Sequence, residues 1–194
     1  YEARRVSKAW DTAHANTLED ANHPSVGAVV LNLLELDANA ELQEQCISNI
    51  QEIGALARQR GISLMVEPLV MKTNSEGGSS SVSDAEQIAT LVRQAVELGA
   101  DIIKVDPVDP MQRFAEVVEI ATPIPVLVRG GGKVTTRELL ERTKTAMEVG
   151  ARGVVYGRNV VQHPEPASLI AALAAIVHSN ASVDEALSLV KEPA

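Results

Sequence analysis

One lysine inside an apolar stretch is the residue of this sequence best suited to covalent chemistry. Lys104 follows Ile102 and Ile103 and precedes Val105 and Asp106. If the stretch is a strand, alternation places Ile102, Lys104 and Asp106 on one face. Removal of an amine from water favours its neutral form, and a neutral amine can attack a carbonyl carbon to form a Schiff base. Lys104 is therefore a candidate nucleophile; the alternatives are a lysine that reaches solvent or a static pair with Asp106.

Two other polar residues interrupt apolar stretches in the same way. Glu67 lies within MVEPLV and Asn32 within VLNLL. A carboxylate beside an iminium can move protons, so Glu67 and Asp106 are candidate acid–base residues. A structural hydrogen bond to a neighbouring strand is the alternative for Glu67. Asn32 could bind a substrate hydroxyl, or it could satisfy backbone groups.

Glycine-bearing turns follow two later apolar stretches and indicate an anion site. The first turn contains Gly130 and Gly131 and comes directly after Arg129, and the second contains Gly157 and Arg158. Without a side chain, backbone N–H groups can approach an anion closely, and a guanidinium group adds a charge-assisted contact. The pairing of two such turns predicts a phosphate site built from these five residues, with plain tight turns as the alternative.

The sequence contains no pattern for a metal or a cofactor. Cys46 is the only cysteine, so neither an intrachain disulfide nor a thiolate zinc cluster can form. The four histidines have no helical ligand spacing, and no nucleotide-binding glycine motif is present. We therefore expect chemistry that uses neither a metal nor a cofactor.

The charge balance narrows the class of partner. The 194 residues include 17 Lys and Arg against 26 Asp and Glu, giving a formal net charge of −9, and only 2% are aromatic. A nucleic-acid or anionic-membrane binder needs a basic surface, and a single-strand reader needs aromatic stacking surfaces. The apolar runs are too short to span a bilayer. We expect a cytoplasmic protein that binds neither nucleic acid nor a membrane.

These residues belong to a repeated strand–helix alternation. The five apolar stretches predicted as buried strands are Ala28–Leu34, Ile62–Val70, Asp101–Pro107, Val126–Gly132 and Gly153–Asn159. Continuous apolar strands with helices between them indicate a parallel sheet, and both an open doubly wound sheet and a (β/α)₈ barrel fit. A barrel usually takes about 250 residues, and only five units are visible here.

Local signals place the connecting segments. A helix is predicted over Ala40–Arg60, and Ser83 with Glu86 forms a possible capping box for the next one. Further capping boxes are predicted at two later positions, Thr135 with Glu138 and Ser182 with Glu185. The polar stretch Lys72–Ser81 predicts a mobile loop at a strand end. The stretch Asp11–Pro24 has no strand pattern, and we expect missing segments near it.

From Ala28 to His178 the sequence resembles the class I aldolases of the deoxyribose-phosphate and archaeal-type fructose-bisphosphate aldolase superfamily. The matching motifs are ELGADIIKVDP around Lys104, PIPVLVRGGGKV and AMEVGARGVVYGRNVVQ. The resemblance implies a (β/α)₈ barrel in which strands four to eight are visible. It also implies that Lys104 is the Schiff-base lysine and that Gly130, Gly131, Gly157 and Arg158 hold a substrate phosphate.

Two departures refine the resemblance. Glu67-Pro68 stands where the fructose-bisphosphate branch usually has a tyrosine, and it is similar to the tagatose-bisphosphate and sulfofructose-phosphate aldolase branch. Arg129 stands where a serine commonly precedes the two glycines. The prediction is a single barrel domain over residues 1–194, incomplete in its N-terminal part, that acts as a metal-independent class I aldolase. We expect it to be a homo-oligomer with a phosphorylated sugar or keto substrate. The alternatives are a Schiff-base transferase acting on a phosphorylated diketone and a non-catalytic phospho-sugar-binding protein.

Overall fold

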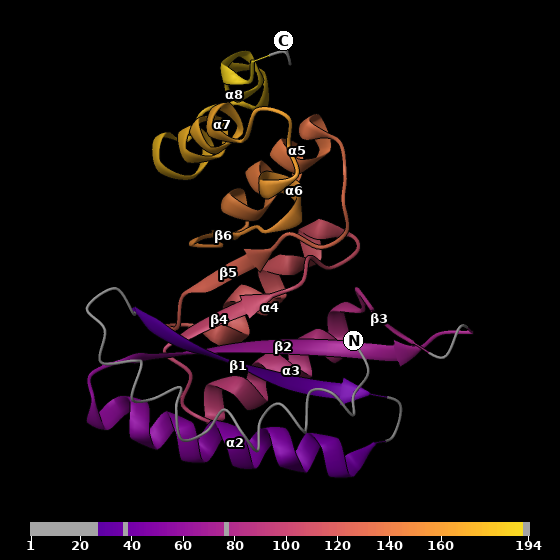
Figure 1. Cartoon of the computed structure of the whole chain (residues 1–194), viewed down its shortest axis with the longest axis vertical. Helices are drawn as coiled ribbons and strands as arrows, with labels where there is room; N and C mark the ends of the chain where they lie inside the picture. Colours follow the sequence, from indigo (N-terminus) through magenta and orange to yellow (C-terminus); the bar gives the residue numbers. More distant parts are fainter. Residues whose placement is uncertain (1–26, 37–38, 76–77, 192–194) are drawn as a thin grey trace. The chain divides into compact units, whose positions relative to one another are not determined.

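The structure, a computed structural model, describes residues 27–36, 39–75 and 78–191. These residues form two compact units, the first ending at Ile103 and the second beginning at Lys104 (Figure 1). The stretch Asp11–Pro24, where we expected missing segments, lies outside the described residues.

The first unit is built on parallel strands joined by helices. Its elements are β1 (Ala28–Leu36), α2 (Ala40–Gln59), β2 (Ser63–Thr73), β3 (Ser79–Ser81), α3 (Ala85–Glu97) and the start of β4 (Ile102–Val105). β2 lies between β1 and β4, and both of these strands run parallel to it. Asp101 fixes the start of β4, because its N–H donates to the Leu64 carbonyl and its Oδ2 accepts from the Leu64 N–H, both at 2.8 Å.

Helices cover one face of these strands. Leu31, Val66 and Ile103 are at most 2% exposed, whereas Val30, one position along from Leu31, is 45% exposed. A β-carbon added at Gly54 of α2 would lie 2.8 Å from Leu64, so this helix packs closely on the buried face.

The polar stretch predicted as a loop forms a hairpin instead. β2 continues to Thr73, and β3 pairs antiparallel with its last three residues, Met71–Thr73. Asn74 closes the turn, since its N–H donates to the Gly78 carbonyl and its Oδ1 accepts from the Gly78 N–H, both at 2.8 Å. The prediction from composition was wrong because an antiparallel ladder needs only main-chain groups and tolerates serine side chains.

The helix starts confirm two of the three predicted capping boxes. Thr135 and Ser182 each accept from the backbone of the glutamate three residues later, and each glutamate bonds back to the cap. The third was wrong: α3 is capped by Asp84, whose side chain accepts from the Gln87 N–H at 2.9 Å. An aspartate is as good an N-cap as a serine, and the helix begins one residue later than predicted.

The second unit contains the remaining strands and helices. After the end of β4 come η1 (Met111–Arg113), α4 (Phe114–Ala121), β5 (Val126–Arg129), α5 (Thr136–Glu148), β6 (Gly153–Val155), α6 (Arg158–Val161), α7 (Pro166–Ser179) and α8 (Val183–Leu189). β5 and β6 are parallel, with Arg129 opposite Val155. Three predicted strands are shorter than expected, because their polar or glycine-bearing ends turn away to form the loops of the candidate site.

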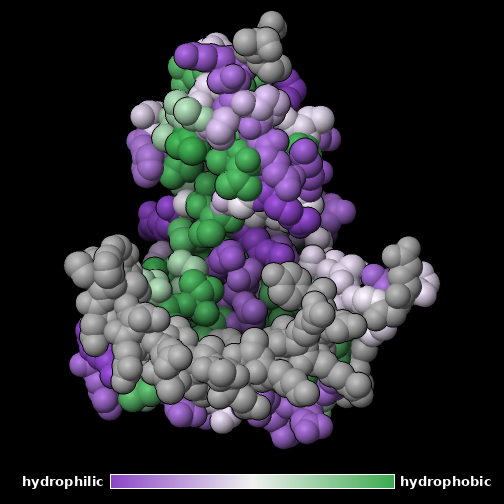
Figure 2. Space-filling model, in the orientation of Figure 1, coloured by the Kyte–Doolittle hydropathy of each residue, from purple (hydrophilic) through white to green (hydrophobic). Residues whose placement is uncertain are grey.

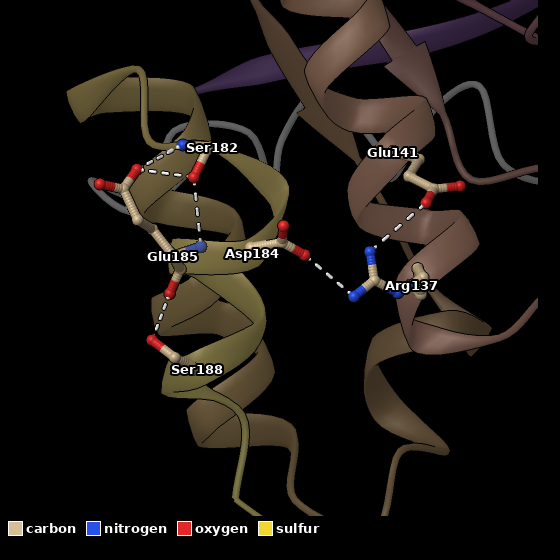
Figure 3. A network of polar contacts seen from close by, with 6 residues as sticks. All are labelled: Arg137, Glu141, Ser182, Asp184, Glu185 and Ser188. Atoms are coloured by element: carbon tan, nitrogen blue, oxygen red, sulfur yellow. Dashed lines mark hydrogen bonds and ion pairs between the residues drawn. The ribbon is translucent and has the colours of Figure 1, made fainter.

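Three helices of the second unit share a hydrophobic core. Its buried residues come from α5, α7 and α8, and they are Leu139, Leu140, Leu169, Ala172, Leu173, Ile176 and Ala186. Polar contacts close its edge: Arg137 of α5 donates to Asp184 of α8 at 2.9 Å, beside the Ser182–Glu185 capping box (Figure 3). The Arg137–Asp184 pair is exposed and adds little stability, so burial of the aliphatic side chains holds the helices together.

Some apolar side chains of the second unit remain at its surface. Figure 2 shows hydrophobic residues on the face in view near α5 and α6, and Val161 of α6 is 74% exposed. In the part of the chain that the structure describes, no helix has the length and apolar character needed to cross a membrane.

Candidate active site

The end of β4 and the end of β5 form the centre of the site in the second unit. Lys104 lies in β4 and is partly buried, and Asp106 follows the strand with only 4% of its surface exposed. Arg129, the last residue of β5, donates from Nη1 to Asp106 Oδ2 at 2.7 Å. The structure thus brings together Asp106 and Arg129, two of the predicted site residues. Asp106 is two positions after Lys104, the candidate nucleophile.

The first glycine turn leaves β5 in a conformation that suits glycine. Gly131 has φ +61°, in the left-handed region, and a β-carbon there would lie 3.2 Å from Arg142 Nη1. At Gly130, a β-carbon would lie 3.2 Å from the Tyr156 ring. Both positions therefore disfavour a side chain.

The second glycine turn is held against the first by hydrogen bonds. Gly157 precedes α6, and a β-carbon there would have no neighbour within 4 Å. Arg158 is exposed at the start of α6. The next residue, Asn159, is buried and donates from Nδ2 to the carbonyls of Gly130 and Gly132, at 3.2 and 3.1 Å. The structure therefore brings the two predicted glycine turns together within the second unit.

Asn32 and Glu67 are neighbours in the first unit. They are register partners across the parallel pair of β1 and β2. Glu67 is buried, at 7% exposure, and Asn32 is partly buried. An amide and a carboxylate on adjacent strands can contact the same ligand.

Sequence analysis missed the residues that support the glycine turns. Besides Asn159, Arg142 of α5 donates from Nη1 to the Gly130 carbonyl at 3.2 Å. Tyr156, directly before Gly157, is bonded through its hydroxyl to Thr143 Oγ1 at 2.9 Å, and burial raises the pKa of the Tyr156 hydroxyl. The position of Asn159 directly after the Gly157-Arg158 pair was the one signal that could have drawn attention to it.

A metal centre is not evident in the described residues. Among residues 27–36, 39–75 and 78–191, no group of three or more His, Cys, Asp or Glu side chains is arranged to hold a metal ion. In the second unit, the polar groups at the ends of β4 and β5 are Lys104, the Asp106 carboxylate and the Arg129 guanidinium, which suits acid–base and covalent chemistry.

The parallel α/β fold agrees with the comparison of the chain with known families. A family model described as DeoC/LacD family aldolase matches residues 5–163, and the chain belongs to this family. The predicted family resemblance is thereby confirmed.

Individual relatives of the chain are also aldolases. The chain is 37% identical over 177 residues to an uncharacterized aldolase of Saccharolobus solfataricus, covering 90% of this chain and 63% of the relative. It is 41% identical over 121 residues to the class 1 fructose-bisphosphate aldolase of Halobacterium salinarum, covering 62% of this chain and 46% of the relative. The chain therefore spans about half to two thirds of the length of these curated relatives.

Solved structures confirm the predicted fold class. A Schiff-base-forming fructose-1,6-bisphosphate aldolase matches with a TM-score of 0.71 at 27% identity, covering 83% of this chain and 62% of that one. The fold is α/β with mostly parallel strands, in the class of the (β/α)₈-barrel aldolases.

Proposed function

We propose that this protein is a metal-independent class I aldolase that acts on a phosphorylated ketose or hydroxy-carbonyl sugar. The observation that carries the proposal is Lys104, which lies in β4 two positions before the Asp106–Arg129 ion pair in a member of an aldolase family. Charged residues at the carboxyl ends of barrel strands usually serve the chemistry of the enzyme.

The proposed reaction proceeds through a covalent intermediate. The Lys104 amine attacks the substrate carbonyl, and loss of water from the carbinolamine gives an iminium ion. The iminium accepts the electron pair of the bond between the α and β carbons of the substrate, and this bond breaks as the β-hydroxyl gives up its proton. The aldehyde formed in this way leaves, and an enamine remains on Lys104. Protonation of the enamine and hydrolysis of the new iminium release the second product and restore the amine.

Carboxylates and an amide assist these steps. In the proposal, Glu67 and Asp106 carry the protons that enter and leave the hydroxyl groups and the carbinolamine. Asn32, the register partner of Glu67, binds a substrate hydroxyl. The burial of Glu67 and Asp106 supports these roles, because a carboxylate shielded from water exchanges protons with the substrate rather than with solvent.

The substrate phosphate is proposed to bind at the two glycine turns. Gly130, Gly131 and Gly157 present backbone N–H groups, while Arg158 adds a charge-assisted contact. Arg129 contributes positive charge from its position beside Asp106. A phosphate fixed there orients the substrate so that its carbonyl carbon meets Lys104, which lowers the entropic cost of the attack. That the enzyme is cytoplasmic and forms a homo-oligomer stays a prediction.

Reduction with borohydride tests the proposed function directly. We expect borohydride, added with a panel of phosphorylated ketoses, to fix the substrate carbon skeleton on the peptide that contains Lys104, as read by mass spectrometry. Among the substrates tested, the one that gives the highest yield of adduct identifies the substrate class. An unmodified Lys104 peptide under conditions of measured turnover would contradict the Schiff-base mechanism.

A further inference from the structure

We propose that Asn159 is a positioning residue that sets the direction in which the first glycine turn presents its N–H groups to the substrate phosphate. This inference rests on the proposed function, because it assigns a role within the phosphate site. Asn159 lies in α6, directly after Arg158, and only 7% of its surface is exposed.

Asn159 makes three hydrogen bonds to the glycine turn. Nδ2 donates to the Gly130 carbonyl at 3.2 Å and to the Gly132 carbonyl at 3.1 Å, while Oδ1 accepts from the Val134 N–H at 3.1 Å. Both amide hydrogens are therefore used, and the orientation of the amide follows from its partners: two carbonyls require the nitrogen and one N–H requires the oxygen. A side chain bound at three points along five residues fixes the path of the turn.

Because the peptide bond is planar, these hydrogen bonds also fix the direction of the neighbouring N–H groups. In a trans peptide, the carbonyl and the following N–H point in opposite directions. The Gly130 and Gly132 carbonyls point toward Asn159, so the N–H groups of Gly131 and Lys133 point away from it. Between the described residues, neither N–H donates to a protein acceptor. Asn159 thus directs two N–H groups away from itself, and in the proposal these two donors face the substrate phosphate.

A second donor supports the same peptide orientation. Arg142 Nη1 donates to the Gly130 carbonyl at 3.2 Å, from α5 rather than α6. A carbonyl that accepts two donors resists rotation, since rotation would break both bonds. Gly131 needs this support because it is in the left-handed region, and a glycine there has many alternative conformations.

The test compares a phosphorylated ketone with its unphosphorylated counterpart. Borohydride trapping on Lys104 is measured against the concentration of dihydroxyacetone phosphate and, separately, of dihydroxyacetone. We expect Asn159→Ala to raise the half-saturating concentration of the phosphorylated ketone about tenfold, since a hydrogen-bond network of this kind is worth about one power of ten. The half-saturating concentration of dihydroxyacetone should stay the same.

Asn49→Ala is the matched control. Asn49 of α2 is a buried asparagine like Asn159, and its Oδ1 accepts from Gln45 Nε2 at 2.9 Å rather than bonding to residues 130–134. We expect this variant to lower the melting temperature while leaving both half-saturating concentrations within about twofold. Equal effects of Asn159→Ala on both ketones, or no effect on either, would overturn the inference.

Two further measurements apply if Asn159→Ala does not fold or if no ketone is trapped. If Asn159→Ala does not fold, Arg142→Lys retains the charge but loses the planar donor, and it should raise the half-saturating concentration of the phosphorylated ketone about threefold. No rise would overturn the inference. If the unmodified protein traps neither of these ketones nor any phosphorylated ketose of the panel, the proposed function fails. Calorimetry with inorganic phosphate then decides the inference, because Asn159→Ala should bind phosphate more weakly than Asn49→Ala. Equal binding by the two variants, or no binding by the unmodified protein, would overturn the inference.

Discussion

Arg129 and Asp106 form an ion pair that joins the end of β5 to the end of β4, with Nη1 and Oδ2 2.7 Å apart. The aspartate side chain is 6% exposed and the arginine side chain 31%. The guanidinium that sequence analysis assigned to the phosphate thus also holds a carboxylate that it assigned to proton transfer. Arg129 therefore has a structural contact that limits how far it can move toward a substrate.

The first prediction concerns the stability that this pair provides. Arg129→Met should lower the free energy of unfolding by roughly 1–3 kcal/mol, because the buried Asp106 carboxylate loses its guanidinium. Arg93→Met is the control, since Arg93 pairs with Glu97 on an exposed helix surface and its loss should cost less than about 0.5 kcal/mol. Urea unfolding measures both. Similar losses in the free energy of unfolding for the two variants would show that the Asp106–Arg129 pair stabilises the protein no more than an exposed ion pair.

A second prediction concerns the nucleophile. Lys104→Arg should reduce turnover by about a thousandfold or more and abolish borohydride trapping, because a guanidinium group stays protonated and cannot attack a carbonyl. Lys144→Arg should leave both unchanged, since Lys144 bonds to Asn180 on the surface of the second unit. Steady-state kinetics and mass spectrometry provide the readouts. Retained trapping in Lys104→Arg would place the Schiff base on another lysine.

The third prediction separates ligand binding from folding at Gly157. A β-carbon at this position meets no atom within 4 Å, so Gly157→Ala should change the free energy of unfolding by less than about 0.5 kcal/mol. It should nevertheless raise KM for a phosphorylated substrate several-fold, while KM for the dephosphorylated analogue stays the same. Equal losses for both substrates would show that Gly157 serves only the turn.

The fourth prediction concerns stability at alkaline pH. Burial raises the pKa of Tyr156, and this effect exceeds the lowering by the Thr143 hydrogen bond and the Arg142 charge. The folded state therefore keeps this proton to higher pH than the unfolded state, whose tyrosine pKa is about 10. The stability contributed by Tyr156 is complete below about pH 10 and falls as the pH rises toward the folded-state pKa.

Unfolding experiments at pH 8 and pH 10.5 test this expectation. The unmodified protein should lose more stability between the two pH values than Tyr156→Phe, which has no hydroxyl to ionise. Parallel losses in the two proteins would mean that Tyr156 ionises as easily in the folded state as in the unfolded state.

The last prediction concerns metals. Activity should persist after incubation with EDTA, because the proposed mechanism uses the Lys104 iminium as its electron acceptor. Loss of activity that Zn²⁺ restores would replace the Schiff-base mechanism with a metal-dependent one.

The sequence alone determined the features that depend on neighbouring residues in the chain. Apolar stretches such as Val126–Arg129 identify strands by their residue types. The capping boxes at Thr135 and Ser182 identify helix starts, because a cap and its partner are three residues apart. Lys104 can be recognised from its neighbours in the sequence as well, because a charged residue within an apolar stretch is identified without knowledge of the fold.

Tertiary structure decided the pairings between distant segments. The Asp106–Arg129 ion pair joins residues 23 apart, and Asn159 reaches back 29 residues to Gly130. The β3 hairpin likewise depends on a main-chain ladder that composition does not reveal. Many polar residues could have formed such contacts. The register of the strands and the turn at each strand end select which ones meet, and these follow from packing of the whole unit rather than from local sequence.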